Sequence, residues 1–313
     1  MAQKKKFRFA VQNSRGASRE DWMTKARRVE ELGFSTLFIP DHFDDQLAPS
    51  PAMMCALDAT TTLRVGGLVF DNDYRHPLVF AKEMATMDVL SGGRVEIGIG
   101  AGWMKSDYDA AGMSYDRPGV RISRMAEAVT IIKRLLHEDG PVSFSGTYYN
   151  ITDHNGLPKP VQKPHPPILI GGGGKRVLSI AAREADIIGV NFNLEQGAVN
   201  RKVLQTGDAA TTDEKIRWIR DAAGDRFDDL ELNVTIFVPI VTDDRMKMAE
   251  RIAPGYGMSP EEALDSPHVL IGNANEIAET LQRRRERYGF SYIAFSGESY
   301  EAMAPVVKQL AGT

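Results

Sequence analysis

The chain has 313 residues, of which 42% are hydrophobic and 26% charged, and its formal net charge is -4 at pH 7. This composition is that of an ordinary globular protein and excludes a disordered chain, while the net negative charge gives no electrostatic reason to expect a nucleic-acid partner. Cys55 is the single cysteine, which excludes an internal disulfide framework and favours a reducing compartment.

Two further absences bear on where the protein works. No segment reaches the roughly 18 consecutive apolar residues that a membrane span needs. The first ten residues, MAQKKKFRFA, contain no apolar stretch long enough for a signal peptide. We therefore expect a cytoplasmic protein with no membrane partner.

Short apolar segments alternate with helical patterns along the chain. A strand at 7–11 precedes a helix at 18–32, where Ser18 is a suitable cap, and later helices are predicted from Pro77 onward, at 119–137 and at 174–184. The predicted strands are 7–11, 36–39, 63–70, 94–100, 166–171, 186–190, 230–241 and 291–296.

Eight strands with helices between them, over about 250 residues or more, are what a (β/α)8 TIM barrel requires. Several strands are apolar on both faces, as in a parallel sheet covered by helices. We predict a single α/β domain over residues 1–313, with a doubly wound open sheet as the alternative that periodicity does not exclude. The segments 140–165, 191–212 and 253–272 are too long for simple loops and are predicted to be insertions that shape or cover the active face.

The first candidate site residue ends the second strand, in the stretch STLFIPDHFDDQ (35–46). Barrel enzymes carry their chemistry at the C-terminal ends of the strands. His42 is therefore predicted to project over the barrel mouth, where an imidazole can exchange protons near neutral pH. The alternative is a histidine that only caps a helix or orders a loop.

Two glycine motifs follow other strands. In ILIGGGGKRVL (168–178), four glycines and two cations stand where a strand meets a helix, which favours phosphate binding by backbone amides over a plain turn. The motif is neither a Walker A loop nor the dinucleotide fingerprint. In GIGAGW (98–103), alternating glycines thin one strand face so that a flat ligand can approach, and Trp103 supplies a wall or lid.

The sequence lacks the motifs that are typical of metal sites, serine hydrolases and cysteine nucleophiles. The six histidines show no metal-binding spacing, and no GxSxG elbow is present, so we expect neither a metal site nor a serine hydrolase. Cys55 follows Met53 and Met54 in a helical pattern that is typical of packing. With no strong protein nucleophile, an organic cofactor is the expected source of reactivity.

Three blocks together resemble the luciferase-like superfamily, and within it the coenzyme F420-dependent oxidoreductases. They are EELGFSTLFIPDHF (30–43), RHPLVFAKEMATMDVLSGGRVEIGIGAGW (75–103) and KPVQKPHPPILIGGGGKRVLSIAAREADIIG (159–189), with weaker similarity over 269–295. The resemblance implies a (β/α)8 barrel with insertions, usually dimeric, whose cofactor ring lies at the barrel mouth.

The resemblance also assigns residues. His42 matches a histidine beside the reactive carbon of the deazaflavin, and Gly67 and Leu68 fall where relatives carry a non-proline cis peptide against the ring. Trp103 stands where the sugar-phosphate dehydrogenases of this branch have an acidic glutamate, so their substrate is not expected here. The full expected cofactor-binding set is Asp41, His42, Gly67, Leu68, Gly100, Gly102, Trp103, Gly171, Gly172, Gly173, Gly174, Lys175 and Arg176.

Two functions follow from this set. The first is hydride transfer between coenzyme F420 and a small organic substrate, with His42 as the catalytic proton-transfer group. The second is a monooxygenase that uses reduced FMN and oxygen, because the same barrel and phosphate loop serve both cofactors.

Overall fold

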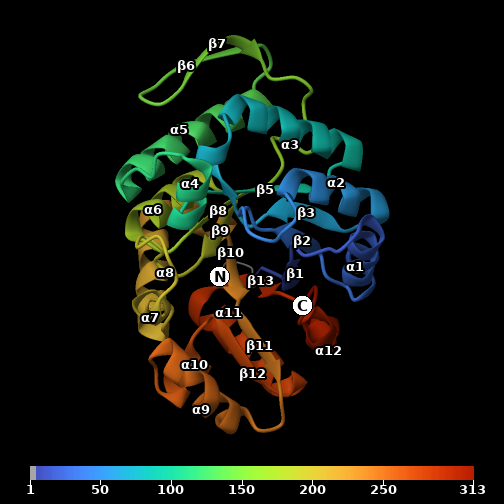
Figure 1. Cartoon of the computed structure of the whole chain (residues 1–313), viewed down its shortest axis with the longest axis vertical. Helices are drawn as coiled ribbons and strands as arrows, with labels where there is room; N and C mark the ends of the chain where they lie inside the picture. The colour runs from blue at the N-terminus through green and yellow to red at the C-terminus, as the bar shows by residue number, and fades with distance from the viewer. Residues whose placement is uncertain (1–4) are drawn as a thin grey trace.

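The computed structural model describes residues 5–313, and its centre is a closed barrel of parallel strands (Figure 1). The barrel closes because β1 pairs with both β2 and β13, while β3 also pairs with β5. The order around the described barrel is β1 (Arg8–Gln12), β2 (Thr36–Ile39), β3 (Arg64–Gly67), β5 (Val95–Gly100), β8 (Ile168–Gly172), β9 (Ile187–Val190), β10 (Glu231–Ile236) and β13 (Phe290–Ser296). The predicted (β/α)8 barrel is confirmed, and the open-sheet alternative is wrong because both edges of the sheet find partners.

Helices surround this barrel. The longer ones are α1 (Arg19–Glu31), α2 (Pro49–Ala59), α3 (Pro77–Ser91), α5 (Pro118–His137), α6 (Lys175–Glu184), α8 (Ala209–Ala223), α9 (Arg245–Tyr256), α11 (Ala274–Tyr288) and α12 (Tyr300–Leu310). The shorter ones are α4 (Lys105–Ala111), α7 (Arg201–Gln205), α10 (Pro260–Asp265) and the 3-10 helices η1 (Asn72–Tyr74) and η2 (Gly224–Asp229). The predicted starts of two of them are confirmed, since Ser18 accepts a hydrogen bond from the Asp21 amide and Pro77 is the first residue of α3.

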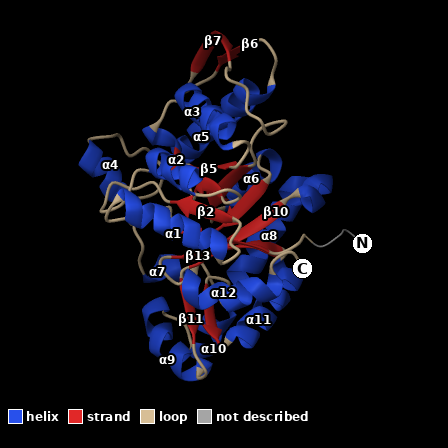
Figure 2. Ribbon diagram, turned by 90° about the vertical axis from the view of Figure 1, so that its right-hand side faces the viewer, coloured by secondary structure: helices blue, strands red, loops and turns tan. Residues whose placement is uncertain are grey.

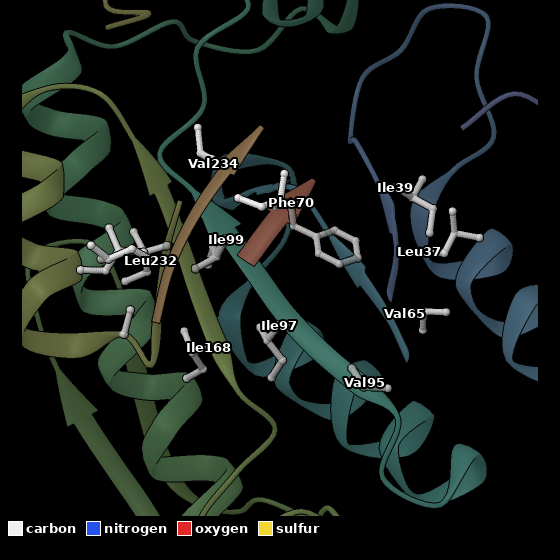
Figure 3. Close-up of a cluster of buried hydrophobic side chains, with 14 of the residues drawn as sticks. Leu37, Ile39, Val65, Phe70, Val95, Ile97, Ile99, Ile168, Leu232 and Val234 are labelled. Carbon is white, nitrogen blue, oxygen red and sulfur yellow. The ribbon is translucent and has the colours of Figure 1, made fainter. Parts of the chain in front are cut away.

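The main core lies between the strands and the helices. Alternate strand residues face outward to the helices, as Leu37 and Ile39 of β2 do, together with side chains from neighbouring strands (Figure 3). The intervening residues, such as Phe38 and Leu169, fill the barrel interior. Because the barrel strands are buried on both faces, the near-continuous apolar segments of the sequence are explained.

Two predicted strands are longer than the structure has them. The predicted strand at 63–70 is interrupted after Gly67 and resumes as β4 (Phe70–Asp71), with a cis peptide bond between Leu68 and Val69. The predicted strand at 230–241 leaves the barrel after Ile236. Its second half, β11 (Val238–Val241), pairs with β12 (Val269–Gly272) in a separate two-stranded sheet, because the Phe237 amide donates its hydrogen bond to the carbonyl of His268, just before β12.

The three long segments divide between the two ends of the barrel. Residues 140–165 form the hairpin of β6 (Pro141–Ser145) and β7 (Asn150–Asn155), which follows the C-terminus of α5 and lies away from the barrel mouth, so its expected place at the active face is wrong. The hairpin and the group of α9, α10, β11 and β12 lie at opposite ends of the molecule (Figures 1 and 2). The segments 191–212 and 253–272 do contribute to the active face, through residues of the β9–α7 loop and Tyr256.

Candidate active site

A cavity of ≈ 580 Å³ opens at the C-terminal ends of the barrel strands. It collects residues that follow β2, β5, β8 and β9, which lie far apart in the sequence and meet only because parallel strands all end at one face. The predicted site residues that line it are Asp41, His42, Leu68, Gly100, Gly102, Trp103, Gly171, Gly172, Gly173, Gly174, Lys175 and Arg176.

Gly67 is the one predicted site residue that does not line the cavity. It is buried in β3, and a Cβ atom there would lie 2.4 Å from Cδ2 of Phe70. Its role is therefore to let the Phe70 ring pack against the barrel. The cis peptide is one residue later than expected, and the Leu68 carbonyl beside it accepts a hydrogen bond from Gln12 Nε2 at 2.8 Å.

His42 is held by the carboxylate of Asp107, a residue that no sequence motif predicted. Its Nδ1 lies 2.7 Å from Oδ2 of Asp107 in α4, and the Tyr74 hydroxyl donates to the same oxygen at 3.4 Å. With Nδ1–H donating to Asp107, Nε2 is the ring nitrogen left for proton exchange. Asp107 was missed because α4 was not predicted as a helix and carries no local motif.

Trp103 lies beside His42 in the cavity wall. The two rings meet edge to face, with centroids 5.5 Å apart and planes at 86°. Tyr115 fixes the Trp103 backbone by donating a hydrogen bond to its carbonyl at 2.8 Å. The indole therefore gives this part of the cavity a flat apolar surface next to His42, a group suited to move a proton.

Asp41 borders the cavity but its carboxylate is already occupied. Arg75 pairs with both oxygens, at 3.1 Å for Nη2–Oδ1, and the Asp71 amide donates to Oδ2 at 3.0 Å. Asp41 thus ties the end of β2 to β4 and positions its neighbour His42.

A second carboxylate that the sequence analysis did not select, Asp71, also lines the cavity. It is 7% exposed, and burial raises the pKa of its carboxyl group to about 7. The Tyr108 hydroxyl lies 3.0 Å and 3.1 Å from its two oxygens. Asp71 directly follows the predicted strand at 63–70. His42 was predicted as a site residue because it follows a barrel strand, and the same argument would have predicted Asp71.

The glycine loop after β8 leads into the N-terminus of α6. Gly174 is the N-cap and has no side chain to cap the helix, so the first amides of α6 are open to an anion. Lys175 is exposed and makes no hydrogen bond or ion pair with the described residues. Arg176 instead donates to the Gly119 carbonyl and to Ser123 Oγ, both at 2.7 Å, so it also anchors α5.

The space around the glycines of this loop differs from one position to the next, and none of them has a positive φ. A Cβ at Gly173 would lie 2.1 Å from the Phe192 carbonyl oxygen, so this glycine lets the chain after β9 pass close by. A Cβ at Gly174 would have only Asn193 near it, at 3.8 Å. Gly174 is therefore the position where a side chain would point into space that a ligand can use.

Residues 5–313 contain neither a candidate metal site nor a candidate membrane span. No group of three or more histidine, cysteine or acidic side chains is arranged to hold a metal ion. No helix in this range is long and apolar enough to cross a membrane.

Comparison with known proteins defines the class. The luciferase-like monooxygenase family matches residues 6–291, which is most of the chain, so the chain belongs to that family. In solved structures, the fold resembles a coenzyme F420-dependent tetrahydromethanopterin reductase from Methanopyrus kandleri, with a TM-score of 0.76 and 18% identity over 98% of this chain and 99% of that one.

Sequence relatives divide between two cofactors. An F420-dependent glucose-6-phosphate dehydrogenase from Kineococcus radiotolerans is 35% identical over 169 residues, covering 51% of this chain and 49% of the relative. An FMNH(2)-dependent dimethylsulfone monooxygenase from Pseudomonas putida is 28% identical over 169 residues, covering 54% of this chain and 45% of the relative. The matched segments thus span about half the length of these curated relatives.

Proposed function

We propose that the protein is an oxidoreductase that transfers a hydride between coenzyme F420 and a small uncharged organic substrate. The observation that carries the proposal is the His42–Asp107 pair, placed against Trp103 in a cavity that continues to the open N-terminus of α6. A proton-transfer group, an apolar wall and an anion-binding end in one cavity suit a cofactor with a flat ring and an anionic tail.

The residues present fit such a cofactor. Gly100 and Gly171 carry no side chain, and Val69 lies against both, so a smooth apolar surface lies at the strand ends. The first amides of α6 and the Nζ of Lys175 suit the anionic tail. When bound, the cofactor supplies or accepts the hydride.

His42 handles the proton that must accompany the hydride. With Nδ1–H donating to Asp107, the protonated imidazole gives its Nε2 proton to the substrate during reduction, and the neutral ring takes one back during oxidation. The Asp107 carboxylate stabilises the protonated ring and holds its orientation, as the acid partner of a catalytic histidine does. Tyr74 keeps the Asp107 oxygen in place.

The charges of the cavity favour a neutral substrate. Arg121 lines the cavity, but its guanidinium donates to three backbone carbonyls. They are those of Ala101 and Gly102, both at 3.3 Å, and that of Asp116. Arg176 donates to Gly119 and Ser123, and Lys175 is bound by the cofactor tail in this proposal, so no cation among the described cavity residues is left for a sugar phosphate. Apolar side chains line much of the remaining wall: Trp103, Met104, Leu194, Val199, Leu204 and Phe237.

An FMN-dependent monooxygenase is the second candidate, supported by the dimethylsulfone monooxygenase relative. A fluorescence titration with each cofactor separates the two. We expect low-micromolar or tighter binding of coenzyme F420, about 8 kcal/mol, and weaker binding of FMN. The reverse order would favour the monooxygenase.

Substrate assays test the second half of the proposal. Reduced coenzyme F420 with a panel of unsaturated ketones should give turnover, whereas oxidised coenzyme F420 with glucose 6-phosphate should give none. Rapid oxidation of the sugar phosphate would contradict the neutral-substrate argument.

We also propose that the chain forms a homodimer through α3. Val79, Val89 and Leu90 on this helix are 51%, 42% and 69% exposed, and such apolar surface is commonly covered by a partner. Light scattering should give the mass of a dimer, and Leu90→Asp should give a monomer. A monomeric wild-type protein would contradict this proposal.

A further inference from the structure

Four acids with buried carboxylates lie together beside the cavity, and three of them have a basic side chain as partner. Asp41 pairs with Arg75, and Asp107 pairs with His42. Asp73 pairs with Arg124 at 2.8 Å. No arginine, lysine or histidine among the described residues pairs with the fourth acid, Asp71.

The hydroxyl group of Tyr108 gives independent evidence about Asp71. Its oxygen lies 3.0 Å and 3.1 Å from the two Asp71 oxygens and 3.1 Å from Oδ2 of Asp73. A phenol has one proton to donate, so it cannot donate to both carboxylates at once. Both contacts are favourable if one carboxyl group carries a proton and donates it to the Tyr108 oxygen.

Asp71 is the acid that carries this proton. Asp73 forms an ion pair with Arg124 and Asp71 has no cationic partner among the described residues, so the assignment consistent with both contacts is that Tyr108 donates to Asp73 and accepts from Asp71. The hydrogen bond from the Asp73 amide supports this assignment. The amide donates to Oδ1 of Asp71 at 2.9 Å, which leaves Oδ2 as the oxygen that carries the proton. Burial, with the nearby charges of Asp73 and Asp41, raises the pKa of Asp71 to about 7, in the same direction.

Asp71 also lies beside the glycines at the end of β5 that line the cavity. It is paired in register with Gly100 across β4 and β5, and a Cβ at Gly102 would lie 2.5 Å from its Oδ2. We propose that Asp71 is a second acid–base residue of the site, which donates a hydrogen bond or a proton to a carbonyl oxygen or an unprotonated nitrogen of the bound cofactor or substrate.

The proposed step is a proton transfer only. The O–H bond of the Asp71 carboxyl group breaks, its electron pair stays on the carboxylate, and the proton bonds to a lone pair of the acceptor. Tyr108 can then turn its hydroxyl proton toward the new carboxylate. No electron passes through Asp71, because the hydride comes from the cofactor. The role toward a bound ligand rests on the proposed function, whereas the protonation of Asp71 does not.

Charged and titratable groups from several elements face Asp71 and set the pH at which it ionises. Those on the loop after β2 and on η1 are Asp41, Asp73, Tyr74 and Arg75, and those on α4 and α5 are Asp107, Tyr108, Arg121 and Arg124. Since Arg75 and Arg124 are each paired with another acid, they leave Asp71 without a neutralising partner.

Infrared spectroscopy of the protein without cofactor tests the protonation. We expect the carbonyl band of a protonated carboxylic acid one unit below pH 7, its loss well above about pH 7, and its absence from Asp71→Asn. The matched control is Asp109→Asn, whose carboxylate is 59% exposed and paired with Lys105. If Asp71→Asn does not fold, carbon-13 labelling of aspartate in the wild-type protein identifies the band. No such band below pH 7 overturns the proposal.

Ligand binding and turnover test the role. If the acceptor is on the cofactor, the wild-type dissociation constant for coenzyme F420 should rise by about tenfold per pH unit above pH 7, and the dissociation constant of Asp71→Asn should not. If the acceptor is on the substrate, only kcat should show this difference. Wild-type and Asp71→Asn profiles of the same shape in both measurements would overturn the acid–base role. Failure to bind coenzyme F420 at any pH would instead contradict the proposed function and leave the infrared result standing.

Discussion

Two buried clusters of charge lie on different sides of the barrel mouth, and their partners differ in kind. The acidic cluster of Asp41, Asp71, Asp73 and Asp107 is held by side chains from other elements, and two of its members reach the cavity. The cationic cluster of Lys215 and Arg284, with the neutral ring of His268 beside them, lies behind the opposite wall and is held by backbone carbonyls.

The difference in partners decides what each cluster can do. Arg284 donates to four carbonyls of the segment before and within β12, and Lys215 donates to the carbonyls of Asn191 and Thr206 at 2.8 Å and 2.6 Å. Carbonyls do not exchange protons, so these cations order loops. A carboxylate beside a histidine or a tyrosine has a partner that does exchange protons, and this suits the acidic cluster to chemistry.

The largest expected effect is on catalysis at the acidic cluster. His42→Ala should lower kcat by about 10²–10⁴-fold, the usual contribution of a general acid–base group, while the protein stays folded and binds its cofactor. Steady-state kinetics with a parallel fluorescence titration measures both. Full activity would leave His42 as a residue that only orders its loop.

The matching change in the cationic cluster should affect stability. Arg284→Met leaves four carbonyls without their donor and should lower the free energy of unfolding by about 3 kcal/mol or more. Arg283→Met, at the exposed neighbouring position of α11, should lower it by less than about 0.5 kcal/mol. Equal losses in urea titrations of the two variants would show that the carbonyl contacts contribute little.

Stability should depend on pH in opposite directions at the two clusters. The pKa of Asp71 is raised in the folded protein, so its contribution to stability is present below its ordinary pKa and falls as pH rises toward about 7. Burial lowers the pKa of His268 to about 3, so its contribution is present above its ordinary pKa and falls as pH decreases toward 3.

Each slope is at most about 1.4 kcal/mol per pH unit. Asp71→Asn should flatten the loss of stability toward pH 7, and His268→Phe should flatten the loss in acid. Urea titrations at several pH values measure both slopes, and unchanged profiles in the variants would contradict the assignments.

A smaller effect is expected from the partner of His42. Asp107→Asn should lower kcat by about tenfold and change the dependence of kcat on pH, because the imidazole loses the acceptor of its Nδ1–H. Asp109→Asn, two residues along α4 and paired only with Lys105, should leave both unchanged. If both variants behave alike, Asp107 is a structural residue of α4.

The smallest effect is expected at the glycine loop. Gly174→Val should weaken cofactor binding by about tenfold, or 1.4 kcal/mol, with an unchanged melting temperature, since the protein leaves room for the side chain. Gly173→Val would not test ligand binding, because it collides with the backbone at Phe192. Unaltered affinity in Gly174→Val would show that the cofactor tail lies elsewhere.

Much of the barrel and part of the site follow from the sequence alone. Buried parallel strands are short apolar segments with helices between them, so their order and number are local signals. Asp41, His42, Trp103 and the glycines of the loop after β8 lie within a few residues of a strand end, and the rule that barrel chemistry gathers there placed them at one cavity.

The tertiary structure decided what those residues contact. The His42–Asp107 bond spans 65 residues, and the Asp71–Tyr108 bond spans 37. Gly67 is needed for packing, because the Phe70 ring occupies the space of a side chain there. Strand β11 leaves the barrel because it pairs with β12, about 30 residues later. No local pattern encodes such pairings, since each depends on where the closed barrel brings distant segments together. The protonation of Asp71 also depends on the tertiary structure, because the fold buries this carboxyl group and places other charges near it.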